Sequence, residues 1–159
     1  MSSCSNNVNS ESIILNKNWK FKAVDDSLWM NVKIPGSVHL GLLENKIIKD
    51  PYYRLNEHDV QWVDKKNWEF KTTFNVSESV LENEVVELQF DGLDTYADVF
   101  LNDEKILQAD NMFISWKVNC KDKLKAGKNE LKIIFESPIT KGLKKREDLP
   151  YLLPGAEND

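Results

Sequence analysis

The sequence has few of the residues that build metal centres and no run long enough to span a membrane. It contains two cysteines, Cys4 and Cys120, and two histidines, His39 and His58. These four residues lack the spacing of a four-ligand zinc site, so we expect neither a metal nor another cofactor. No stretch approaches the roughly 18 consecutive apolar residues of a transmembrane helix. The sequence therefore predicts a chain without a transmembrane segment.

Clustered charge of one sign is also missing. The 21 basic and 26 acidic residues give a net charge of −5, and both signs are spread along the chain. Nucleic-acid binding requires a concentrated basic face, so the sequence argues against a nucleic-acid partner. At 159 residues the chain has room for one domain and is too short for a (β/α)8 barrel, which needs about 250 residues.

Apolar residues alternate with polar ones in six short runs, and large aromatic residues supply many of the apolar positions. A period of two is typical of antiparallel strands with one buried face. The turn residues between the runs, at 102–103 and 126–129, predict hairpins. We therefore predict an all-β sandwich whose strands include residues 19–21, 68–76, 86–90, 97–101, 114–120 and 131–135.

Residues 35–62 interrupt the alternation. Val38, Leu42 and Leu43 fit one face of a short helix that follows the Pro35-Gly36 turn and is broken by Asp50-Pro51. The remainder predicts a long aromatic and charged loop, the part of a sandwich that usually carries function.

The ends of the chain differ from the middle. Residues 1–12 are polar and predict a disordered lead-in, residues 13–138 form the predicted sandwich domain, and residues 139–159 predict a linker or the start of a next segment. Tyr151 and its apolar neighbours have no evident place to pack, which favours a fragment of a longer protein. Cys4 permits two interpretations: an ordinary tail, or the remainder of a lipoprotein signal, which would place the protein in the periplasm or at the cell surface.

Several motif strings are specific enough to compare with known families. They occupy residues 34–39, 48–57, 60–63, 68–70, 90–99, 101–102, 110–113 and Trp116. These strings resemble the N-terminal domain of family 2 glycoside hydrolases, in their β-mannosidase branch. The Gly-Leu-Asp-Thr-x-Ala-x-Val-x-Leu-Asn stretch is shared broadly in that family, whereas Asp-Pro-Tyr-Tyr with Val-Gln-Trp-Val favours the mannosidase branch. Asp103 departs from the usual glycine of the Leu-Asn-Gly turn.

The resemblance implies a jelly-roll sandwich similar to galactose-binding domains, at the head of a chain that hydrolyses terminal non-reducing β-D-mannosides with retention. Retention needs two carboxyl groups about 5–5.5 Å apart. In the resembling family both lie on a later barrel, so the full-length protein is expected to be an enzyme and this chain is not. Its partner would be its own downstream catalytic domain, and β-mannoside sugars are a second candidate. The Asn56-Glu57 pair is interpreted as a coincidental match to the catalytic acid motif.

Five residues of the long loop are candidates for a surface that faces the active-site pocket or the adjoining domain. Carboxylate, guanidinium and amide groups bind sugar hydroxyls, and flat rings stack on sugar C–H faces. The same residue types also anchor protein interfaces. Domain interface, sugar contact and internal loop packing all stay open, in that order of preference. The candidates are Asp50, Tyr53, Arg54, Gln61 and Trp62.

Other polar residues receive structural interpretations. Asp94, Thr95 and Asp98 are expected to satisfy backbone groups near a turn, and Glu57 to pair with Arg54 or Lys65. Trp19, Trp68 and Trp116 are in phase with strand faces and are expected in the core, whereas the Asn-Met-Phe at 111–113 is a candidate interface. Cys120 predicts a buried thiol with no disulfide to Cys4.

Two alternatives to the glycosidase interpretation stay open. One is a free-standing carbohydrate-binding module with a concave aromatic face. The other is an interaction domain with no sugar ligand.

Overall fold

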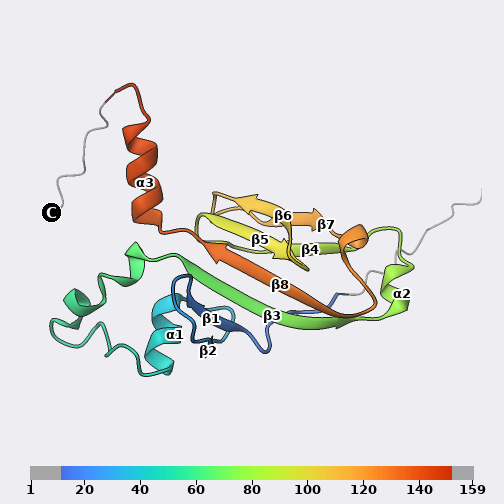
Figure 1. The fold of residues 1–159 in the computed structure, drawn as a ribbon, viewed down its shortest axis with the longest axis horizontal. Helices are drawn as coiled ribbons and strands as arrows, with labels where there is room; N and C mark the ends of the chain where they lie inside the picture. The colour runs from blue at the N-terminus through green and yellow to red at the C-terminus, as the bar shows by residue number, and fades with distance from the viewer. Residues whose placement is uncertain (1–11, 152–159) are drawn as a thin grey trace, which may run out of the picture.

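The computed structural model describes residues 12–151, which form two facing antiparallel sheets (Figure 1). The larger sheet has the strand order β2-β1-β3-β8-β5-β6 and the smaller sheet pairs β4 with β7. This arrangement confirms the predicted all-β sandwich. The strands are β1 (Lys20–Ala23), β2 (Met30–Asn31), β3 (Trp68–Val76), β4 (Glu87–Phe90), β5 (Ala97–Leu101), β6 (Glu104–Ala109), β7 (Trp116–Asn119) and β8 (Gly127–Phe135).

Short helices fill the connections between strands. The α-helices are α1 (Val38–Glu44), α2 (Glu78–Leu81) and α3 (Pro138–Glu147), and the 3-10 helices are η1 (Asn56–Val60), η2 (Val63–Lys65) and η3 (Lys121–Lys123). No helix in residues 12–151 has the length and apolar character needed to cross a membrane. Residues 1–11 of the predicted lead-in, Cys4 among them, lie outside the described residues, as does the end of the predicted linker.

Side chains that alternate along the strands form the core. Phe21, Val99 and Leu101 are completely buried. Trp19 and Trp68 are buried as predicted, whereas Trp116 is half-buried because the smaller sheet covers it incompletely.

The hairpin prediction at 102–103 is confirmed, and the one at 126–129 is wrong. Asn102 and Asp103 both have positive φ, 51° and 68°, and connect the paired strands β5 and β6. Asp tolerates this conformation, which explains why Asp103 replaces the usual glycine. At the second position Gly127 has a positive φ of 83°, but β7 and β8 belong to different sheets, so no hairpin joins them.

The predicted helix after the Pro35-Gly36 turn is α1. The Ser37 hydroxyl accepts a hydrogen bond from the Leu40 amide at 3.2 Å and caps its start. The helix ends at Glu44, well before Asp50-Pro51, because Lys46 takes a left-handed conformation with a φ of 60°. The Asn45 side chain adds a hydrogen bond to the Gly41 carbonyl at 2.8 Å. Leu42 is buried against the sheet.

Strand register brings several loops to one end of the sandwich. Trp68 pairs with Phe135, Phe135 with Ala97, and Ala97 with Ala109. The loops next to these residues, 45–67, 91–96 and 110–115, therefore lie together with α3, which projects from the same end (Figure 1). We call this group of segments the aromatic end.

Candidate functional site

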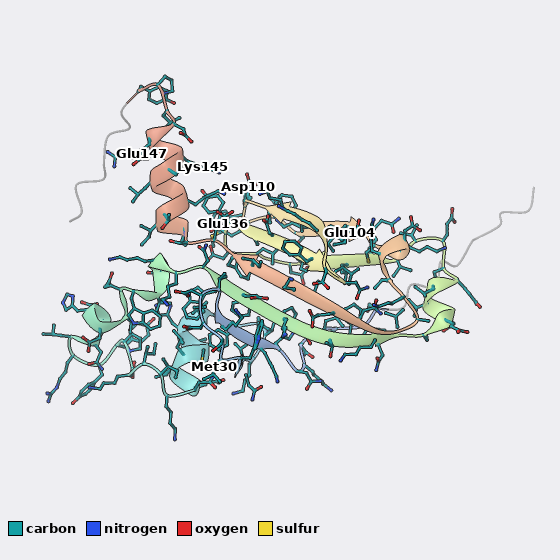
Figure 2. The ribbon with its side chains drawn as sticks, viewed as in Figure 1. Met30, Glu104, Asp110, Glu136, Lys145 and Glu147 are labelled. Atoms are coloured by element: carbon teal, nitrogen blue, oxygen red, sulfur yellow. The ribbon has the colours of Figure 1, made fainter. Side chains whose placement is uncertain are left out.

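The aromatic end carries most of the exposed large apolar side chains of the described chain. Tyr52 is 97% exposed and Phe113 87% exposed. Tyr53, Leu55 and Trp62 are exposed beside them on the long loop. The opposite end, formed by residues 77–86, 102–103 and 120–126, is polar and charged, and Val85 is its one exposed large apolar residue among those described. In Figure 2, Lys145 lies on α3, Asp110 and Glu136 lie near its base, and Glu104 lies farther along the sandwich.

Asp50 organises the tip of the long loop. Its carboxylate accepts a hydrogen bond from the Tyr52 amide at 3.0 Å. Its carbonyl accepts from the Tyr53 amide at 3.1 Å and from Asn56 Nδ2 at 2.9 Å. The Arg54 guanidinium lies 5.1 Å from the centre of the Tyr53 ring, and both side chains are exposed. The structure thus places three of the predicted site residues in one exposed turn.

Gln61 and Trp62 lie on the other side of the loop. Gln61 Nε2 donates a hydrogen bond to the Glu57 carbonyl at 3.2 Å, and this side-chain bond stabilises η1. The Trp62 ring lies 6.1 Å from the buried Trp68 ring and is 36% exposed. Lys66 Nζ lies 6.0 Å from the Trp62 ring centre. Trp62 therefore connects the core to the surface.

A shallow hollow of about 180 Å³ opens beside Trp62. Of the five predicted site residues it includes Trp62 alone, and sequence reasoning missed the others that line it. A tryptophan beside amide, ammonium and carboxylate groups fits a ligand rich in hydroxyls. The lining residues are Ile47, Ile48, Lys49, Asn56, Asp59, Val60 and Trp62.

Helix α3 is fixed at its base but exposed along its length. Ser137 Oγ donates to the Asp64 carbonyl at 2.6 Å and accepts from the Thr140 amide at 3.1 Å. The Ser137 amide donates to Asn67 Oδ1 at 2.7 Å. These bonds attach α3 to η2 and to the residues that follow it. The Ser137-Pro138 pair is a helix-start signal, an N-cap serine followed by proline at the first helical position, and sequence reasoning did not use it.

A second contact braces α3 against the loop at 91–96. Lys145 Nζ lies 4.5 Å from the Tyr96 ring centre. Lys141 Nζ bonds both carboxylate oxygens of Glu136, at 2.8 and 2.9 Å, and this bond raises the pKa of Lys141. Ile139 and Leu143 remain exposed on the helix. A fixed helix with uncovered apolar residues is suited to docking.

The end of α3 forms a wider hollow of about 410 Å³ with the residues that follow it. Its lining is more apolar than that of the hollow beside Trp62. The lining residues are Leu143, Arg146, Glu147, Leu149, Pro150 and Tyr151.

The structural interpretations of Asp94, Thr95, Asp98 and Glu57 need correction in detail. Thr95 donates to the Asp94 carboxylate and lies 3.9 Å from the sulfur of Met112. Asp98 forms an ion pair with Lys105 across β5 and β6 at 2.7 Å, and does not cap the turn. Glu57 is exposed and has no ion pair within residues 12–151, so the predicted pairing is wrong.

Three acidic residues of the long loop lie at the surface. Asp50, Glu57 and Asp59 are all exposed, whereas a general acid depends on an environment that holds its proton. Within residues 12–151 no three histidine, cysteine, aspartate or glutamate side chains are grouped to hold a metal ion. What the site offers is surface for binding and docking.

Comparison with known proteins identifies the class. The family model described as "Glycosyl hydrolase 2 galactose-binding domain-like" matches residues 19–159. The chain belongs to this family, and the predicted resemblance is confirmed.

Comparison with individual proteins shows that this chain is similar to β-mannosidases. The chain is 41% identical over 141 residues to β-mannosidase B of Thermothelomyces thermophilus, covering 87% of this chain and 16% of that protein. It is 38% identical over 128 residues to the β-mannosidase of Capra hircus, covering 80% of this chain and 14% of that protein. The β-D-mannosidase structure from Dictyoglomus thermophilum superposes with a TM-score of 0.88 at 42% identity, over 90% of this chain and 18% of that one. The chain thus corresponds to the N-terminal domain of β-mannosidase-like proteins and spans less than one fifth of these relatives.

The exo-chitosanase of Amycolatopsis orientalis shares the fold alone. It superposes with a TM-score of 0.66 at 21% identity, over 74% of this chain and 16% of that one.

Proposed function

We propose that this chain is the non-catalytic N-terminal domain of a retaining exo-glycosidase that hydrolyses terminal β-D-mannosides. The domain packs on the catalytic barrel through its aromatic end and shapes the pocket there. The observation that carries the proposal is the concentration of exposed aromatic and apolar side chains at one end of the sandwich. The similarity to β-mannosidases several times longer than this chain supports it.

The residues of the aromatic end have two kinds of task in this proposal. Tyr53, stacked with Arg54, and Phe113 are side chains of the type that anchors protein interfaces. Trp62, beside its hollow, faces the pocket and contacts the bound sugar or its neighbours. A group that does no chemistry still raises the rate by holding the substrate in reacting geometry.

The test is the kinetics of aryl β-mannoside hydrolysis by the full-length polypeptide. Replacing Trp62 with alanine is expected to raise KM about tenfold, which equals roughly 1.4 kcal/mol of lost binding. Tyr53→Ala is expected to weaken the contact between this domain and the barrel. It should therefore lower the unfolding temperature of the full-length protein and leave that of the 159-residue chain unchanged.

Glu82→Ala and Glu84→Ala, on exposed residues at the opposite end, are the controls and should change neither quantity. Unchanged KM and unchanged unfolding temperature in both test variants would contradict the proposal.

The hollow beside Trp62 favours one second candidate, a carbohydrate-binding module that acts without a catalytic partner. This alternative predicts that millimolar mannose or mannobiose raises the unfolding temperature of the 159-residue chain alone. The docking proposal predicts no shift, because the sugar contacts of Trp62 need the barrel to complete them.

A further inference from the structure

The outer face of the larger sheet carries a line of lysines. Strand register places Lys20 of β1 opposite Lys71 of β3, and Lys71 opposite Lys132 of β8. The line continues through Phe100 of β5 to Lys105 of β6. The residues next to these positions in β1, β3, β8 and β5 are buried, so the line faces away from the core. Residues far apart in the sequence thus meet in one line, and we call its four lysines the lysine row.

The register of the lysine row is unfavourable for the sheet itself. Like charges that lie directly opposite each other on neighbouring strands destabilise the pairing. Lys20 and Lys71 have no ion pair within residues 12–151. Lys132 contacts Asp103 at 3.3 Å, but the Asp103 side chain is 85% exposed. A fold that accepts this repulsion indicates that the charges have a function.

Aromatic rings hold ammonium groups of the row in place. Lys71 Nζ lies 4.1 Å from the centre of the Trp29 ring, and Lys132 Nζ lies 5.2 Å from the centre of the Phe100 ring. Lys22, beside the row, places its Nζ 5.3 Å from the same Trp29 ring. Such a contact attracts the cation to the ring but does not cancel its charge. The ammonium groups are therefore oriented in advance and remain available to an anion.

Carboxylates border the lysine row on both sides. Glu69 and Asp98 lie next to it on one side, and Glu130 lies on the other. Glu69 pairs with Lys22 at 3.2 Å, and Asp98 pairs with Lys105 at 2.7 Å. The positive charge is therefore a narrow line, on a chain whose net charge is −5. The strands of this face direct three carboxylates outward and six lysines, namely Lys20, Lys22, Lys71, Lys105, Lys128 and Lys132.

We propose that the lysine row binds a linear acidic polysaccharide, whose carboxylate or sulfate groups pair with the ammonium groups. The row is one side chain wide, so it fits a single extended chain. A duplex nucleic acid or a lipid surface is broader and would bring its anions against the flanking carboxylates. Neighbouring strands lie about 4.8 Å apart, and a linear chain of sugar rings repeats at a similar length.

The affinity for a thin polyanion depends on the row alone. The choice of a polysaccharide among thin polyanions rests on the proposed function, which places this domain in an enzyme that acts on sugars. The row would then hold the enzyme on an acidic polymer while the pocket of the catalytic domain acts on chain ends.

The test is binding of polygalacturonate, a linear polyuronate, by the full-length polypeptide at low salt. The unaltered protein is expected to bind it and to lose affinity as the salt concentration rises. The row variant, which combines Lys20→Gln, Lys71→Gln and Lys132→Gln, should bind at least about tenfold more weakly. Lys71→Gln alone should weaken binding about threefold, and it decides the outcome if the triple variant does not fold.

The matched control changes the net charge by the same amount away from the row. It combines Lys117→Gln, Lys121→Gln and Lys125→Gln, on β7 and the segment that follows it, where none of the three lysines has an ion pair within residues 12–151. Its affinity should fall by less than about twofold.

Four outcomes would overturn the proposal. The unaltered protein does not bind polygalacturonate, or the row variant and the control variant bind it equally well. Single-stranded DNA or phosphatidylserine vesicles bind more tightly than polygalacturonate, which would assign the row to another partner. The row variant lowers the unfolding temperature of the full-length polypeptide but not of the 159-residue chain, which would show that the row packs on the rest of the polypeptide.

Hydrolysis of an aryl β-mannoside by the unaltered full-length protein separates this inference from the proposed function. A protein that binds polygalacturonate through the row but does not hydrolyse β-mannosides would contradict the proposed function alone. A protein that hydrolyses β-mannosides but does not bind polygalacturonate would contradict the inference about the row alone.

Discussion

At the scale of single residues, Gly41 is where the packing of α1 on the sheet leaves no spare room. A Cβ at this position would lie 2.7 Å from Phe21 Cζ and 3.2 Å from Val32 Cγ2. Phe21 is completely buried and cannot move aside. Gly41→Ala is therefore expected to destabilise the fold by about 1–2 kcal/mol, since overpacking outweighs the helix propensity of alanine.

Urea unfolding measures this effect, and α3 offers a matched control. A Cβ at Gly142 would meet nothing within 4 Å, so Gly142→Ala should stabilise α3 by about 0.5–1 kcal/mol through helix propensity alone. Equal effects of the two substitutions would contradict the packing explanation.

Cys120 is confirmed as a buried thiol, 1% exposed. Burial raises its pKa because the thiolate would lose its hydration, and the thiol donates to the Val86 carbonyl at 3.4 Å. As pH rises past the ordinary thiol range, the unfolded chain therefore releases this proton while the folded protein keeps it. The free energy of unfolding should fall toward alkaline pH, because ionisation of the thiol favours the unfolded chain.

Thiol reactivity checks this expectation in a Cys4→Ser variant, where Cys120 is the remaining cysteine. At neutral pH Cys120 should react with an aromatic disulfide reagent at least about a hundredfold more slowly in the folded protein than in urea. Comparable rates in the two states would show that the thiol is accessible.

At the scale of elements, α3 depends on one serine for its attachment. Ser137→Ala removes the hydrogen bond to the Asp64 carbonyl and the one that the Thr140 amide donates to the serine hydroxyl. The loss should lower the stability of the attached helix by about 1–2 kcal/mol. We expect trypsin to cleave roughly five- to thirtyfold faster at the basic last turn of α3, which contains Lys144, Lys145 and Arg146.

Ser77→Ala is the comparison variant, because Ser77 precedes α2 without capping it through its side chain. It should leave cleavage within α3 unchanged. Equal cleavage rates in the Ser137 variant and the unaltered chain would mean that α3 is held by other contacts.

The six alternating runs predicted six strands, and all six exist, because burial of one face imposes a period of two. The two missed strands lack that period. β2 has only two residues. In β6 the register shifts, because Val99 pairs with Leu107 whereas Phe100 pairs with Lys105. Ile106 is the extra residue at this shift, and both Ile106 and its neighbour Leu107 are half-buried, which interrupts the alternation. The sequence pattern therefore could not indicate β6.

The site was predictable only in part for a similar reason. Trp62 could be singled out by residue type, but its hollow is built from Ile47, Lys49 and Asp59, which the path of the loop brings together. Asp50 and Gln61 instead bond their own loop, which no residue type indicates. The assignment of the family needed none of this geometry, because it depended on motif strings.

At the scale of the whole molecule, the sandwich has two unlike ends and one incomplete layer. The aromatic end carries most of the exposed large apolar side chains of the described residues, as our proposal of docking on a barrel requires. Within residues 12–151 the smaller sheet has two strands and the larger sheet six.

The most direct measurement is hydrolysis of an aryl β-mannoside by two purified proteins, the 159-residue chain and the polypeptide extended to its natural stop codon. The proposed function predicts turnover by the longer protein and none above the buffer rate by the short chain. Turnover by the short chain, retained after a second purification step, would contradict the assignment of a non-catalytic domain, and inactivity of the longer protein on β-mannosides would contradict the assignment of its substrate.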